Sequence, residues 1–174
     1  MALLVFLFLF GAAHPAAGSA VSAPALKAAF LYNFAKFAEW PPEAQAGPLT
    51  MCVLDEPAVA DALEITVKGR TIAGRDLAVA RVKMDELQKC QLLYVGGQDA
   101  RRLAQVIEQL RTTAVFTVGD RDGFAESGGV AAFFIENARM RFAINVDAAQ
   151  RARLRLSSRL LSLSKLVKED HVQP

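Results

Sequence analysis

Few residues of this chain have the types and spacing that catalysis requires. Among its 174 residues are two histidines, His14 in an apolar N-terminal segment and His171 in a polar C-terminal one. A Ser-His-Asp or Cys-His arrangement needs an imidazole held rigidly beside its nucleophile, and most catalytic zinc sites need histidine ligands. The sequence therefore predicts no catalytic residue, no metal site and no cofactor, and a protein that is not an enzyme.

Two loops carry weak signs of ligand binding. The segment 94–103, "YVGGQDARRL", has two glycines between a strand and a helix, where helix N-termini can bind phosphate. It matches neither the dinucleotide pattern nor the P-loop pattern, so we interpret it as an ordinary loop. The segment 119–129, "GDRDGFAESGG", contains Asp120, Asp122 and Glu126 but lacks the spacing of an EF-hand, and we interpret it as a turn.

Two pairs of adjacent acidic residues remain. Asp85 and Glu86 most simply begin a short helix, where negative charge suits the helix dipole. Glu169 and Asp170 are assigned to a solvated polar tail, residues 169–174. A hydrolase whose two carboxylates face one cleft is an alternative that the sequence leaves open.

The N-terminal segment has the composition of a secretory signal peptide. Residues Ala2–Ala13 carry no charge, and small-residue runs that resemble cleavage sites follow them. This run of about 12 residues is shorter than the ~20 that a membrane-spanning helix needs, so we expect no stable membrane anchor. Cleavage after Ala20 or Ala23 would leave about 150 residues, the size of one domain. We predict a signal peptide over 1–23, export to the periplasm, and a single domain over 24–168.

Export also affects the expected state of the two cysteines, Cys52 and Cys90. An oxidising compartment favours a disulfide between them, and two buried free thiols are the alternative. The net charge of the chain is +2. Because this charge is small, it gives no reason to expect nucleic acid or an anionic membrane surface as a partner.

Hydrophobic periodicity predicts the elements that would position any site. A helix is expected from Pro24 to Trp40, ended by two prolines, with an apolar face of Leu26, Phe30, Phe34 and Phe37. Strands are then expected at 49–54, 76–82, 91–96 and 114–120, alternating with helices at 56–67, 84–90 and 98–111. This alternation predicts a three-layer α/β domain, with a mainly parallel sheet covered by helices on both faces.

The last third of the chain changes pattern. Residues 128–146 form two apolar runs, which predict a C-terminal antiparallel hairpin with Glu136, Asn137 and Ala138 between them. A final helix, capped by a serine, is expected to carry four leucines, Leu160, Leu161, Leu163 and Leu166; Ser157 or Ser158 can be the cap.

Seven segments occur in an order that is typical of a known family. They are "LKAAFLYNFAKFAEWP", Cys52 in a first strand, "VKGRTIAGRDLAVARV", Cys90 before "LLYVGG", "VFTVGDRDGFAESGGVAAFF", "RFAINVDAA" and "SSRLLSLSKLV". With these segments the chain resembles the YfiR family of bacterial periplasmic proteins over nearly all of its mature length. Some relatives carry a second cysteine pair in the later half, which this chain lacks, so no role of that pair is carried over.

The resemblance implies a regulatory function. YfiR-like proteins are repressors that bind the periplasmic sensor domain of an inner-membrane diguanylate cyclase, restraining cyclic-di-GMP synthesis and biofilm formation. For this chain the resemblance implies a periplasmic regulatory binding protein with such a sensor domain as its partner. The alternative is a periplasmic protein that binds a small ligand and has no cyclase partner.

The first predicted contact site is the aromatic N-terminal helix. Its aromatic residues can simply be core, since a terminal helix with such a face is stable only when docked. Alternatively, part of this face lines a pocket or a contact in a homodimer, because exposed aromatic side chains mark binding surfaces. The residues predicted for that role are Asn33, Lys36, Phe37 and Trp40.

The second predicted contact site follows the late hairpin. Here an apolar centre of Phe142, Ile144 and Leu154 is flanked by Arg141 and Arg155, a composition that protein interfaces favour. We predict these five residues as a partner-binding surface. The alternative is that the apolar side chains face the core and the arginines form a solvated rim.

Overall fold

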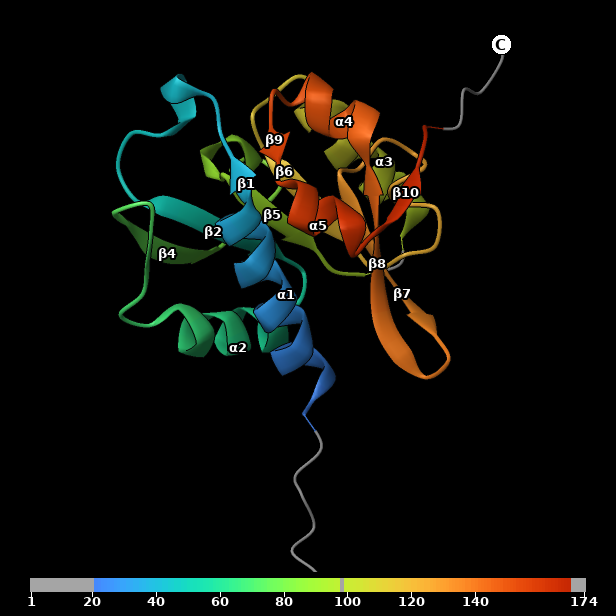
Figure 1. Ribbon diagram of the computed structural model, residues 1–174, viewed down its shortest axis with the longest axis horizontal. Helices are drawn as coiled ribbons and strands as arrows, with labels where there is room; N and C mark the ends of the chain where they lie inside the picture. The colour runs from blue at the N-terminus through green and yellow to red at the C-terminus, as the bar shows by residue number, and fades with distance from the viewer. Residues whose placement is uncertain (1–20, 98, 170–174) are drawn as a thin grey trace, which may run out of the picture.

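A computed structural model describes residues 21–97 and 99–169 of the protein (Figure 1). The predicted signal peptide, residues 1–23, lies almost wholly outside the described residues, and so do residues 170–174 of the predicted tail.

The centre of the molecule is an 8-stranded sheet with the order β10-β8-β7-β6-β5-β2-β4-β3. Its strands are β2 (Leu49–Leu54), β3 (Thr71–Ile72), β4 (Arg75–Arg81), β5 (Leu92–Val95), β6 (Phe116–Gly119), β7 (Ala131–Glu136), β8 (Arg139–Asn145) and β10 (Lys165–Val167). The neighbours from β4 to β7 pair in parallel, whereas β7 and β8 form an antiparallel hairpin. The predicted mainly parallel sheet with a late hairpin is therefore confirmed.

Helices cover both faces of the sheet, as predicted. One face carries α1 (Ala23–Phe37), α2 (Pro57–Val67), α4 (Val146–Arg151) and α5 (Ser158–Ser162), and the other carries α3 (Ala100–Leu110). Figure 1 shows α1 crossing in front of the sheet between α2 and α5. Two 3₁₀ turns, Pro42–Ala44 and Leu87–Lys89, and a small ribbon of β1 (Ala38–Glu39) and β9 (Arg155–Leu156) complete the fold.

The strand sequences explain the two covered faces. Successive side chains of a strand point to opposite faces, so a strand that is apolar throughout supplies two cores at once. In β2, Met51 and Val53 belong to the core under α1 and α2, whereas Cys52 and Leu54 belong to the core under α3. Each apolar run in the sequence thus requires helices on both sides of the sheet.

The N-terminal helix ends earlier than predicted. It stops at Phe37, and Ala38 is extended, with φ −113° and ψ 146°. Ala38 and Glu39 instead pair with Leu156 and Arg155 as the two-residue β1–β9 ribbon. Trp40 directly precedes Pro41, and a residue before a proline disfavours helical geometry, so the helix ends before Trp40.

The C-terminal region also differs from its prediction. Asn145 caps α4, a short helix that was not expected. Ser157 caps α5 as predicted, but the helix ends at Ser162 and Leu166 lies in strand β10. The chain leaves the helix because the outer edge of β8 offers backbone hydrogen-bonding groups, with which β10 pairs in parallel.

Candidate functional site

A hollow beside the β1–β9 ribbon brings together residues from the two predicted contact sites. It has a volume of about 290 Å³ and is lined by Lys36, Phe37, Ala38, Glu39, Arg155, Leu156 and Ser157. We call it the ribbon hollow. Lys36 and Phe37 belong to the first predicted set, and Arg155 to the second. Nearly 120 residues of sequence separate the two sides, so only the fold could bring them together.

The end of α1 and the start of α5 position the ribbon hollow. The backbone amide of Ser157 donates to the carbonyl of Phe37 at 3.0 Å, which fixes the two segments to each other. The hydroxyl of Ser157 also accepts from the amide of Leu160 and so begins α5. One serine therefore joins the ribbon to the helix that borders it.

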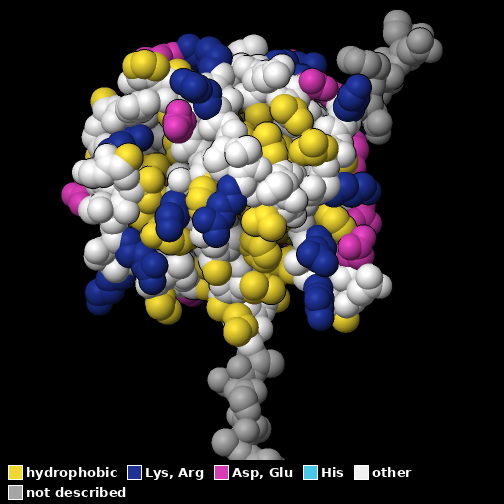
Figure 2. Space-filling view, in the orientation of Figure 1, with side chains coloured by type: hydrophobic (Ala, Val, Ile, Leu, Met, Phe, Trp, Pro, Cys, Tyr) yellow, Lys and Arg dark blue, Asp and Glu magenta, His cyan; other side chains and the backbone are white. Residues whose placement is uncertain are grey.

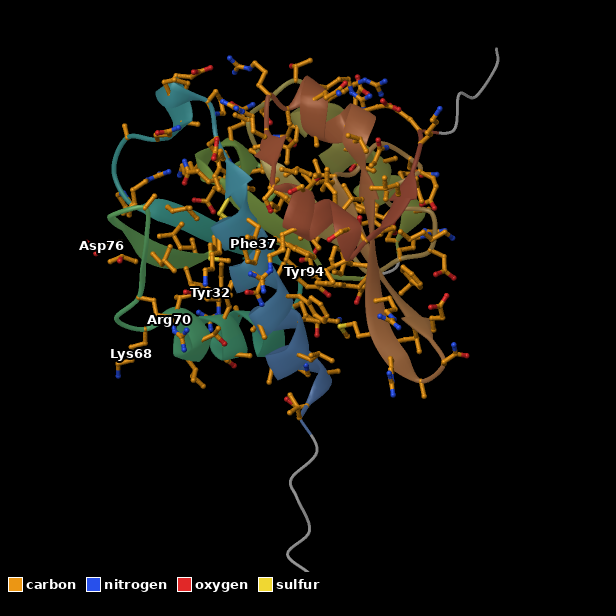
Figure 3. All side chains as sticks on the ribbon, viewed as in Figure 1. Tyr32, Phe37, Lys68, Arg70, Asp76 and Tyr94 are labelled. Carbon is orange, nitrogen blue, oxygen red and sulfur yellow. A yellow bond between two sulfur atoms is a disulfide. The ribbon has the colours of Figure 1, made fainter. Side chains whose placement is uncertain are left out.

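The ribbon hollow combines an aromatic ring with positive charge. Phe37 lies at the end of α1 beside α5 (Figure 3), with the Lys36 ammonium 5.8 Å and the Arg159 guanidinium 5.6 Å from its ring centroid. The side chain of Arg155 is 87% exposed, and its Nε lies 3.9 Å from a Glu39 carboxylate oxygen. Figure 2 shows lysine and arginine side chains gathered beside hydrophobic ones over this part of the surface. A ligand with an aromatic or apolar group and a negative charge suits such a site.

The other two residues of the first predicted set lie elsewhere. Trp40 is 5% exposed, and its indole Nε1 donates to the carbonyl of Gln91 at 2.9 Å, so most of the side chain belongs to the core. It borders a second hollow of about 290 Å³, which shares Ala38 and Glu39 with the ribbon hollow. Asn33 is exposed, donates to the carbonyl of Ala29, and lines neither hollow.

The prediction of a docking surface centred on Phe142, Ile144 and Leu154 is wrong. These side chains are 6%, 0% and 5% exposed, because Phe142 and Ile144 face the core under α1 from β8 and Leu154, in the loop before β9, packs into the same core. The Phe142 ring, for example, lies edge-on to Phe34 at 5.0 Å between centroids. Arg141 and Arg155 are exposed, but their surroundings differ: Arg141 lies 3.9 Å from Glu136 on the hairpin, and Arg155 borders the ribbon hollow.

A cluster of Lys27, Tyr94 and Asp120 was not predicted. The Lys27 ammonium donates to a carboxylate oxygen of Asp120 at 2.5 Å and to the Tyr94 hydroxyl at 2.8 Å. The Tyr94 hydroxyl in turn donates to the same carboxylate oxygen at 2.9 Å. Burial, reinforced by the negative charge of Asp120, raises the pKa of Tyr94 well above its usual value. The sign of this cluster in the sequence was Lys27, a charged residue among the apolar residues of the first helix.

This cluster occupies a position where α/β proteins commonly bind ligands. Tyr94 lies near the carboxyl end of β5, and Asp120 directly follows β6. Ligands of open parallel sheets bind outside these strand ends. Here Lys27 of α1 reaches that position from within the chain, so its charge already balances the carboxylate.

The acidic side chains do not form a metal site in the part of the chain that the structure describes. No three His, Cys, Asp or Glu side chains gather there closely enough to hold a metal ion. Glu169, assigned to a solvated tail, is instead 11% exposed and ion-paired with Arg111 and Arg151. That assignment is therefore corrected.

The two cysteines form the predicted disulfide. Cys52 of β2 and Cys90, just before β5, are joined with their Cα atoms 5.8 Å apart, and both are buried. The bond links β2 to the residue two positions before β5, its parallel neighbour in the sheet. The alternative of two buried free thiols is excluded.

Comparison with known proteins gives the lineage of this domain. A sequence profile of the YfiR/HmsC-like family matches residues 24–165. The chain belongs to the YfiR/HmsC-like family. The match includes both sides of the ribbon hollow and the disulfide, and it ends at Lys165, the first residue of β10.

Solved structures support the α/β fold of this YfiR/HmsC-like protein. One neighbour is described as the ABC domain in complex with L-Trp from Streptococcus pneumonia, with a TM-score of 0.53, 14% identity, and coverage of 83% of this chain and 60% of that chain. Another is a conserved domain protein from Vibrio cholerae, with a TM-score of 0.52, 14% identity, and coverage of 85% and 60%. The chain thus spans 60% of the length of each neighbour, and the likeness concerns the fold alone.

The described part of this YfiR/HmsC-like chain lacks a helix with the length and hydrophobicity needed to cross a membrane.

Proposed function

We propose that this protein is a periplasmic regulatory binding protein that represses an inner-membrane diguanylate cyclase by binding the periplasmic sensor domain of that enzyme. Its action limits cyclic-di-GMP synthesis and biofilm formation. The observation that carries the proposal is the match to the YfiR/HmsC-like family over residues 24–165. The disulfide supports an oxidising compartment, and a regulatory role requires no catalytic group of its own.

The ribbon hollow is the surface that we assign to the sensor domain. Interface centres favour aromatic residues and arginine, and the hollow offers Phe37 and Arg155, with Arg159 over the Phe37 ring. An apolar anchor of the partner would contact the Phe37 ring, and an acidic group beside it would meet the guanidinium groups.

Binding of the purified sensor domain tests this proposal. We expect Phe37→Ala and Arg155→Glu each to weaken binding about tenfold or more, because both act at the centre of the contact. The matched control is Lys68→Glu, which reverses an exposed charge far from Phe37 (Figure 3). Cyclic-di-GMP in cells that contain the cyclase should rise with the first two variants and stay unchanged with the third. Wild-type affinity in folded Phe37→Ala and Arg155→Glu proteins would exclude the hollow as the binding surface.

A second candidate function is the binding of a small ligand without a cyclase partner. The volume of about 290 Å³ and the ring flanked by cations favour a small aromatic carboxylate. One solved neighbour of similar fold is described as in complex with L-Trp, an aromatic amino acid. Thermal unfolding with a panel of aromatic acids distinguishes the candidates: this function requires a shift in the absence of any partner protein, abolished by Phe37→Ala.

A further inference from the structure

The last described residues form a strap along the edge of the sheet. Strand β10 (Lys165–Val167) pairs in parallel with Ala143–Asn145 of β8, and Glu169 follows it. We call residues 165–169 the C-terminal strap. Leu166 is 57% exposed, and Val167 is the strap's apolar side chain that packs against the core under α3.

A carboxylate niche fixes the end of the strap. One carboxylate oxygen of Glu169 lies 2.5 Å from the guanidinium of Arg151, and the other lies 3.1 Å from that of Arg111. Arg151 is the last residue of α4, and Arg111 directly follows α3. Two elements from opposite faces of the sheet thus converge on one carboxylate, which is 11% exposed.

The niche is closely packed and has hydrogen-bonding capacity left over. A Cβ atom at Gly128 would lie 3.1 Å from Ile107 and 3.2 Å from the Glu169 carboxylate, so a side chain there would crowd both groups. The Nε of Arg151 is buried and has no hydrogen-bond partner among the described residues. Glu169 therefore uses only part of what the niche can donate.

The outer edge of β8 also has backbone hydrogen-bonding groups that the C-terminal strap does not use. β8 has 7 residues and β10 has 3, and their pairing covers only Ala143–Asn145. In the described chain, residues 139–142 of β8 have no strand on that side. The exposed Arg139 and Arg141 lie on this part of β8, which favours an acidic partner. A longer strand could form more backbone hydrogen bonds with β8 than the strap does.

We propose that the outer edge of β8 and the niche of Arg111 and Arg151 are a recognition site for an extended acidic segment of a partner protein, and that the C-terminal strap occupies this site within the chain. The strap shows the chemistry of the occupant: a strand that pairs in parallel with β8 and places a carboxylate in the niche. Such a partner segment replaces the strap and continues along residues 139–142. This site is separate from the ribbon hollow and does not depend on the function proposed for it.

Hydrogen exchange of the exported chain tests whether the Glu169 carboxylate holds the C-terminal strap in place. Glu169→Gln keeps the shape of the side chain but removes its charge, so we expect amide exchange about tenfold or more faster in residues 165–168 and Ala143–Asn145. Exchange in β5 should not change. The matched control, Lys168→Gln, alters an exposed neighbouring charge and should match the wild type. Equal exchange in the Glu169→Gln and wild-type proteins, or faster exchange throughout the domain, would overturn the proposal.

A peptide with the sequence of residues 164–170, "SKLVKED", tests recognition directly. Added to the full Glu169→Gln chain, it should shift the NMR signals of Ala143–Asn145 and the side-chain signals of Arg151. A peptide with glutamine in place of the glutamate that corresponds to Glu169 should bind at least about tenfold more weakly. Absence of binding, or equal binding of both peptides, would refute recognition of the carboxylate. A dimer of the wild-type chain in light scattering that is lost in Glu169→Gln would identify the occupant as the strap of a second copy and would also overturn the proposal of a different partner.

Discussion

Individual side chains fasten α1 to the sheet through charge as well as through apolar contact. Lys27 and Asp120 are 15% and 21% exposed, and the buried Tyr94 hydroxyl connects them. At this degree of burial, a charge that loses its partner is poorly compensated by water. The cluster therefore stabilises the domain only while all three groups are present.

Replacement of Lys27 by methionine tests this dependence. The variant leaves the Asp120 carboxylate without its ammonium, and we expect the free energy of unfolding to fall by about 1–3 kcal/mol. Urea unfolding measures the change. The double variant Lys27→Met/Asp120→Asn should lose less than the single one, because it removes the carboxylate charge together with its ammonium. A larger loss in the double variant would contradict this account.

Tyr94 makes a second prediction at the residue scale, which concerns alkaline pH. Its pKa is raised in the folded state by burial and by Asp120, whereas in the unfolded chain the tyrosine hydroxyl has its ordinary pKa of about 10. Below that pH both states keep the proton, so this residue adds no pH dependence. Above it only the unfolded state loses the proton, and the free energy of unfolding falls by up to about 1.4 kcal/mol per pH unit. In unfolding measurements from pH 8 to 11, Tyr94→Phe should show a shallower decline, and an equal slope would contradict the prediction.

At the scale of elements, the sequence predicted what depends on local periodicity. The apolar runs that became β2, β5 and β6 and the amphipathic helix α3 were found because each pattern is complete within a few residues. The β1–β9 ribbon and β10 were missed, since two or three residues give no period and their pairing depends on strands far away in sequence. The ribbon hollow could be predicted only as separate parts for the same reason.

The start of α1 gives a prediction about processing. Ser22 is the N-cap of this helix, and its hydroxyl accepts from the amide of Ala25. Cleavage after Ala20 keeps this cap, whereas cleavage after Ala23 removes it, at a cost of about 0.5–2 kcal/mol. We expect the exported protein to begin at Val21. Mass spectrometry of the intact exported chain measures the site, and a mass that corresponds to Pro24 as the first residue would contradict the prediction.

Across the whole molecule, overall charge conceals local charge. The net charge of +2 argues for no particular partner, yet Lys36 and Arg159 flank the Phe37 ring and Arg155 lines the same hollow. These cations come from the two ends of the domain, so composition could not reveal their proximity. The disulfide has a similar long-range effect, because it links β2 to the segment just before β5 within the core under α3.

Removal of the disulfide tests how much the whole fold depends on that covalent link. The bond joins residues 38 apart in sequence, and on the chain-entropy model such a loop stabilises the folded state by up to about 4 kcal/mol. We expect Cys52→Ala/Cys90→Ala to lower the urea midpoint, because the unfolded chain gains conformational freedom while the buried sites become slightly underpacked. Reductant should lower the midpoint of the wild type and leave that of the variant unchanged. Equal midpoints for the variant and the oxidised wild type would show that strand pairing and core packing hold β2 against β5 without the covalent bond.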